Sequence, residues 1–120
     1  MPILPIPFVN LAKEVIFTKY LTNRNFDRSV IRSRYAAVLF CANCCGPSRM
    51  ARESFRSVSK TRKNVGFFTV DIDAEELLAK RCGVEVIPAV LFFADGEPLL
   101  VRYGISGKKS LEDTLDRLTK

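Results

Sequence analysis

The chain has 120 residues, enough for one folded domain and too few for two that each bury a sizeable core. Apolar residues make up 48% of it and charged residues 27%, which is typical of a globular domain, and the net charge of +6 favours acidic partners. Histidine is absent, which excludes Ser-His and Cys-His catalysis, the usual zinc hydrolase sites and any histidine pH switch.

Residues 1–14 are apolar and contain three prolines, at positions 2, 5 and 7. Proline lacks an N–H and fixes φ, so this segment is predicted to be extended rather than helical. We interpret it as an extension packed on the domain or loose, or alternatively as a docking arm for a partner or a membrane surface. It lacks the basic first part of a signal peptide, and no stretch approaches the roughly 20 apolar residues of a membrane-spanning helix.

The next residues predict a strand, a helix and a second strand. Residues 15–21 mix β-branched and aromatic side chains, as a first strand does. A short helix is expected to follow, with Phe26, Val30 and Ile31 facing inward. The apolar run over residues 36–40 then predicts a buried strand, as expected in an α/β domain.

A cysteine turn, residues 41–48, separates that strand from a long predicted helix. Met50 and Phe55 belong to an apolar face with helical spacing. Cys45 therefore stands at a strand-to-helix turn, where free N–H groups and the positive end of the helix dipole stabilise a thiolate. Gly46 and Pro47 suit the tight turn and the first helical turn that follow.

The same helix carries a basic stripe, Arg49, Arg52, Arg56 and Lys60, with spacings of three, four and four residues. No aromatic side chains are interleaved with it for base stacking, which argues against a nucleic-acid partner. We interpret the stripe mainly as a solvated face, with an acidic protein surface as the alternative partner.

The chain then continues to alternate strands and helices. Residues 65–73 predict a central strand, and Asp73 is expected to cap a helix in which Leu77 and Leu78 face the core. Gly83 is placed to end that helix.

Two further strands and a helix are predicted at the end of the chain. One of these strands is predicted over residues 89–93. Asp95-Gly96 predicts a hairpin turn from it into the last strand of the chain, over residues 99–103. Pro98 indicates that this last strand lies at a sheet edge. A final helix is expected to carry three leucines on one face: Leu111, Leu115 and Leu118.

The cysteine turn resembles the active-site segment of the thioredoxin family, in which Trp-Cys-Gly-Pro-Cys follows a central strand and opens a long helix. Other segments resemble the family in order and spacing: Asp71-Ile72-Asp73 at a strand end, Val86-Ile87-Pro88-Ala89 as a cis-proline loop, Asp95-Gly96-Glu97 as a hairpin turn, and Gly104. The resemblance covers a domain over residues 15–120. It implies an α/β fold with a central mixed sheet of about five strands flanked by about four helices, and a substrate-binding loop at Ile87 and Pro88.

Residues 45–48 read Cys-Gly-Pro-Ser, where the family has Cys-Gly-Pro-Cys. By this resemblance Ser48 replaces the resolving cysteine, and Leu39 replaces a buried aspartate thought to shuttle protons. Cys41 and Cys44 replace two tryptophans. The resemblance therefore implies a nucleophilic cysteine without its usual supporting groups.

Three functions fit these residues. The first is monothiol thiol–disulfide exchange at Cys45, in which glutathione or a similar thiol, the substrate's second thiol, Cys41 or Cys44 releases a mixed disulfide. The second is a non-catalytic binding or adaptor module that uses the groove beside Pro88. The third is a soft metal or iron–sulfur cluster on the three cysteines of the turn, for which one chain supplies too few ligands.

We favour the first function, with Cys45, Gly46, Pro47 and Ser48 as the catalytic segment. The expected partner is a protein with a disulfide or a reactive thiol, or a glutathione-like thiol, and no cofactor is expected. Four cysteines without an export signal indicate a reducing compartment, the cytoplasm.

We predict that Cys45 is the most reactive thiol of the chain. The helix N-terminus, with Arg49 one turn later, should lower the Cys45 pKa below the unperturbed value of about 8.5. Mass-resolved alkylation at neutral pH should label Cys45 first. Labelling of Cys45 no faster than that of Cys82 would contradict both the pKa argument and the enzymatic interpretation.

Overall fold

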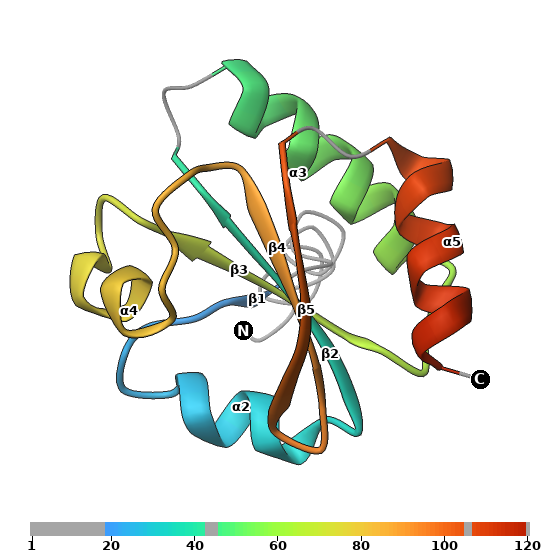
Figure 1. The fold of residues 1–120 in the computed structure, drawn as a ribbon, viewed down its shortest axis with the longest axis horizontal. Helices are drawn as coiled ribbons and strands as arrows, with labels where there is room; N and C mark the ends of the chain where they lie inside the picture. The colour runs from blue at the N-terminus through green and yellow to red at the C-terminus, as the bar shows by residue number, and fades with distance from the viewer. Residues whose placement is uncertain (1–18, 43–45, 105–106, 120) are drawn as a thin grey trace, which may run out of the picture.

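The computed structural model describes residues 19–42, 46–104 and 107–119. Within these residues the chain forms one five-stranded sheet and four helices (Figure 1), which confirms the predicted architecture. The predicted extension, residues 1–14, and the first part of the predicted first strand lie outside them. The elements in chain order are β1 (Lys19–Tyr20), α2 (Phe26–Arg32), β2 (Tyr35–Cys41), α3 (Gly46–Ser59), β3 (Gly66–Asp71), α4 (Glu76–Arg81), β4 (Ala89–Ala94), β5 (Glu97–Tyr103) and α5 (Lys108–Leu118).

The sheet is mixed, with the strand order β1-β3-β2-β4-β5. β1 and β2 pair with β3 in parallel, whereas β4 pairs with β2 and β5 in antiparallel fashion. β2 is thus the central strand, and its residues 36–41 are all buried. A strand buried on both faces needs a continuous apolar sequence, which is why this segment shows no alternation of polar and apolar residues.

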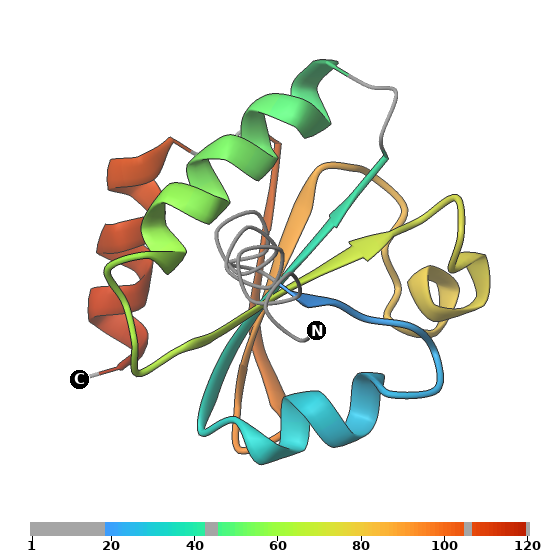
Figure 2. The same ribbon diagram turned by 180° about the vertical axis from the view of Figure 1, so that it is seen from behind.

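Helices cover both faces of the sheet, α3 and α5 on one side and α2 and α4 on the other (Figures 1 and 2). Successive side chains of β2 point to opposite faces. Leu39 and Cys41 therefore pack with α3 and α5, while Val38 and Phe40 pack with α2 and α4. Cys41 and Leu39 thus lie on the face covered by the helix that follows the cysteine turn.

Left-handed backbone conformations reverse the chain at two predicted turns. Asp95 and Gly96 have φ values of 52° and 86° in the tight turn between β4 and β5, as a primed hairpin turn requires. Gly83, with φ of 74°, follows α4 and donates its N–H to the Lys80 carbonyl. β5 lies at the sheet edge, as Pro98 predicted.

Two apolar side chains predicted to face the core are exposed instead. Ile31 is 63% exposed and Leu77 is 72% exposed, whereas their neighbours Val30 and Leu78 are buried. Successive residues of an α-helix are separated by about 100°, so two adjacent side chains of a short helix do not share one narrow buried face. The inward placement of Ile31 and Leu77 was therefore wrong.

The predicted cap of α4 at Asp73 was also wrong. The helix begins at Glu76, and its N-cap residue, Glu75, makes no side-chain capping bond. Asp73 instead lies in a turn that precedes the helix, where its N–H donates to the Asp71 carboxylate at 3.0 Å. The local bonds of Asp71 thus place the N-cap of the helix two residues later than predicted, at Glu75.

Leu77 and Leu78 form a matched pair for measuring core packing. Leu78→Ala should lower the free energy of unfolding by about 2–5 kcal/mol, because it leaves a cavity among fully buried side chains. Leu77→Ala should change it by no more than about 0.5 kcal/mol, because Leu77 is mostly in solvent. Urea unfolding of both variants measures the difference, and equal losses would contradict the observed orientation of α4.

Candidate functional site

The cysteine turn joins the carboxyl end of β2 to the amino end of α3. The structure describes Ala42 before it and Gly46 after it, while the predicted nucleophile Cys45 and the candidate resolving Cys44 lie outside the described residues. Gly46 and Pro47 are exposed in the first turn of α3. Cys45 is therefore bonded directly to the first residue of a 14-residue helix.

Ser48 is fully buried in the first turn of α3, with 0% of its surface exposed. Its Oγ accepts a hydrogen bond from the N–H of Ala42 at 3.1 Å. The side chain at the position where the resemblance expects a resolving cysteine therefore connects the end of β2 to α3. A hydroxyl group makes this bond well but cannot attack a mixed disulfide.

Arg52 lies one turn after Ser48 and also reaches Ala42. Its Nη1 donates to the Ala42 carbonyl at 3.2 Å and lies 3.9 Å from the Cys41 sulfur. Arg52 is half-buried, so the prediction of a uniformly solvated basic stripe was wrong at this position, although Arg49 and Arg56 are exposed. The sequence signal that was missed is the spacing of four residues from Ser48, which puts both side chains on one face of the helix.

The two cysteines among the described residues, Cys41 and Cys82, are both free thiols. Burial raises the pKa of the Cys41 thiol above its ordinary value, and the hydrogen bond from Arg52 offsets part of the rise. Burial likewise raises the pKa of Cys82, which packs on the opposite face of the sheet. Both sulfurs are therefore weak nucleophiles at neutral pH.

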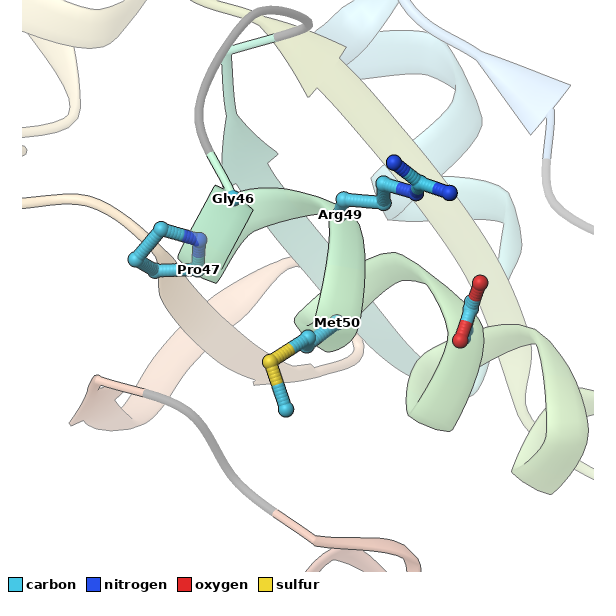
Figure 3. Close-up of a pocket in the computed structure, with 5 residues that line it drawn as sticks. Gly46, Pro47, Arg49 and Met50 are labelled. Atoms are coloured by element: carbon cyan, nitrogen blue, oxygen red, sulfur yellow. The ribbon is translucent and has the colours of Figure 1, made fainter.

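An open depression lies on the outer side of the first two turns of α3 (Figure 3). Pro47 and Met50 supply its apolar surface, and Arg49 and Glu53 add opposite charges. Met50 is 57% exposed, so its predicted place on the buried face of the helix was wrong. The residues of α3 that are buried are Ser48, Ala51, Phe55 and Val58.

The proline loop lies at the same edge of the sheet as the cysteine turn. The peptide bond between Ile87 and Pro88 is cis, and Pro88 is buried. Ala89, the first residue of β4, pairs with Phe40 near the carboxyl end of β2. The N–H of Gly104 donates to the Pro88 carbonyl at 2.8 Å, which ties the loop to the end of β5. The topology therefore brings Ile87 and Pro88 close to the carboxyl end of β2, which the cysteine turn follows.

The described residues offer neither a metal site nor a membrane-spanning helix. They contain no group of three or more Cys, Asp or Glu side chains that could hold a metal ion. The hypothesis of a cluster on the cysteine turn involves Cys44 and Cys45, which lie outside this part of the chain. None of the helices from α2 to α5 is long and apolar enough to cross a membrane.

The sequence profile of the thioredoxin family matches residues 17–117. The chain belongs to the thioredoxin family. Thioredoxin of Mycoplasmoides gallisepticum is 31% identical over 98 residues, which cover 81% of this chain and 98% of that protein. Human thioredoxin is 33% identical over 85 residues, which cover 71% of this chain and 80% of that protein. This homology supports a thioredoxin-like redox function in general.

Solved thioredoxin structures have the same fold. A thioredoxin of Halobacterium salinarum superposes with a TM-score of 0.81 at 23% identity, covering 86% of this chain and 91% of the other. The thioredoxin of Fasciola hepatica gives 0.77 at 26% identity, covering 83% and 98%. The fold that the resemblance implied is therefore confirmed.

Removal of the Ser48 hydroxyl should destabilise the fold. Ser48→Ala leaves the N–H of Ala42 without its acceptor, which should lower the free energy of unfolding by about 1–3 kcal/mol. Ser59→Ala is the matched control, because the Ser59 hydroxyl bonds an exposed carbonyl at the far end of the same helix. Its expected effect is within about 0.5 kcal/mol. Denaturant unfolding that gives the two variants the same stability would contradict the role of the buried bond.

Proposed function

We propose that this thioredoxin-family protein carries out thiol–disulfide exchange through one catalytic cysteine, Cys45. Its thiolate attacks one sulfur of a disulfide, forms a mixed disulfide and expels the other sulfur as a thiolate. A second thiolate then attacks the mixed disulfide and releases Cys45, so that one disulfide is reduced and another is formed. The observation that carries the proposal is the buried bond of Ser48, which occupies the resolving position with a structural hydroxyl.

The start of α3 supports a thiolate at Cys45. The helix begins at Gly46, the residue after Cys45, and its first backbone N–H groups have no partner within the helix. Its first turn contains no acidic side chain, and Arg49 lies in it. Positive charge and unpaired N–H groups at a helix N-terminus favour the thiolate over the thiol.

The thiol that releases Cys45 comes most readily from outside the chain. Cys41 is buried and its raised pKa keeps it protonated, which makes it a poor attacking group. Glutathione, a similar thiol or the substrate's own second thiol fits better, with Cys44 as the internal alternative. We further propose that the partner is a protein disulfide or reactive thiol that contacts Ile87 and Pro88, in a reducing compartment such as the cytoplasm.

A non-catalytic binding module is the second candidate, and Leu39 is the observation that favours it. Leu39 is fully buried on the α3 face, at the position where the family carries an aspartate. The apolar side chain offers no group for proton transfer beside the cysteine turn. A partner could then bind beside Pro88 without turnover.

Ser48→Cys distinguishes an exchange catalyst from a binding module. A thiol at position 48 would lie one helical turn from Cys45 and could attack the mixed disulfide intramolecularly. Reduction of a model protein disulfide with a thiol regenerant should then accelerate roughly tenfold or more over wild type. We expect the gain to be partial, because Leu39 still provides no carboxylate.

Ser54→Cys is the control, because it adds a thiol to the same helix two turns from the start. This variant should match the wild type, and Cys45→Ser should abolish the reaction. If Ser48→Cys folds, keeps Cys45 open to alkylation and shows no rate above wild type, the exchange function is rejected in favour of the binding module.

A further inference from the structure

Both backbone polar groups of Ala42 are bound by side chains of α3. Ser48 accepts from its N–H and Arg52 donates to its carbonyl, at 3.1 and 3.2 Å. Ala42 is buried and follows the last residue of β2. Side chains four residues apart lie on one face of a helix, so one short surface of α3 holds this residue from two sides.

The Arg52 guanidinium also contacts the last side chain of the central strand. Its Nη1 lies 3.9 Å from the Cys41 sulfur, so one group bridges Cys41 and the Ala42 carbonyl. A hydrogen bond from a charged donor in a half-buried position is stronger than a neutral one. Arg52 therefore fixes the end of β2 against α3 more firmly than backbone bonding alone would.

Ala42 and Gly46 flank the three residues that include Cys45. Gly46 is part of α3, and Ala42 is bound to α3 through Ser48 and Arg52. Both ends of this short connection are thus attached to the same helix. Release of Ala42 would therefore free one of the two ends of the connection that contains Cys45.

We propose that Arg52 is a positioning residue for the thiol chemistry of Cys45. Together with Ser48 it holds Ala42, the described residue from which the cysteine turn continues, and this hold favours the thiolate of Cys45. The inference rests on the proposed function of Cys45. It assigns to Arg52 a mechanical task that the exposed cations of the same helix do not share.

Other charged groups lie around Arg52 and enter the design of the test. Tyr20 on β1 interacts electrostatically with Arg52, and Asp71 on β3 interacts with Cys41, which Arg52 contacts. Arg49 and Arg56 lie on α3. Loss of Arg52 removes a positive charge as well as a bond. A control must therefore remove an equal charge from the same helix without releasing Ala42.

The test compares Arg52→Met with Arg49→Met. Arg49 is exposed and closer to Cys45 along the helix, so it controls for the loss of charge. Alkylation rates of Cys45 against pH, resolved by mass spectrometry, give its pKa in each protein. Hydrogen exchange of the Ala42 amide reports independently on the bonds to Ala42.

Arg52→Met should raise the apparent pKa of Cys45 by roughly half to one unit and slow its labelling below that pKa by about three- to tenfold. Exchange at Ala42 should accelerate in Arg52→Met and stay at the wild-type rate in Arg49→Met, which should give the smaller pKa shift. An unchanged profile in Arg52→Met, or an equal or larger shift in Arg49→Met, would overturn the positioning role alone. A wild-type Cys45 that titrates as an ordinary cysteine would instead overturn the proposed function, and the positioning role with it.

Discussion

The attachment of Ala42 to α3 is the constraint on which the site depends. The central strand β2 is buried on both faces and pairs with β3 and β4, so its carboxyl end has a fixed place in the sheet. Ser48 and Arg52 also fix the next residue, Ala42, by binding it to the first turns of the helix. The cysteine turn therefore connects two elements whose relative position is already set by packing and by two hydrogen bonds, one buried and one partly buried.

The chemistry of the site follows from what this chain places around that constraint. Ser48, at the position where the resemblance expects a resolving cysteine, makes a stronger hydrogen bond than a thiol would. This bond orders the start of the helix, but the hydroxyl group cannot attack a mixed disulfide. Leu39 adds apolar packing where a carboxylate would carry a proton. Burial keeps Cys41 protonated. These differences agree with the proposed function, in which Cys45 is the exchanging thiol and a second thiol releases it.

Much of the fold could be predicted from sequence because its signals are local. A continuous apolar run indicated β2, and Asp95-Gly96 indicated the hairpin, since each depends on few neighbouring residues. The orientations of Ile31, Leu77 and Met50 could not be predicted in this way, because each stands beside another residue that suits the core and only packing decides between them.

The candidate site likewise has a part that the sequence predicted and a part that it did not. The motif at residues 45–48 and the loop at Pro88 were recognisable from residue order, and the topology brings their surroundings to one edge of the sheet. The contact of Arg52 with Ala42 could not be recognised from residue order. A basic residue at helical spacing gives the same sequence pattern whether its side chain points to solvent or to the end of a strand. Only the packing of β2 against α3 decides which of these two orientations the Arg52 side chain adopts.

Trapping of the mixed disulfide tests the central claim most directly. The wild-type protein is mixed with a peptide that contains a disulfide, quenched with acid and mapped by mass spectrometry. We expect one covalent adduct per chain, on Cys45, which persists until a free thiol such as glutathione is added and then disappears. Absence of an adduct on Cys45 would contradict single-cysteine exchange at this site. Modification of Cys41 or Cys82 to the same extent as Cys45 would contradict it as well.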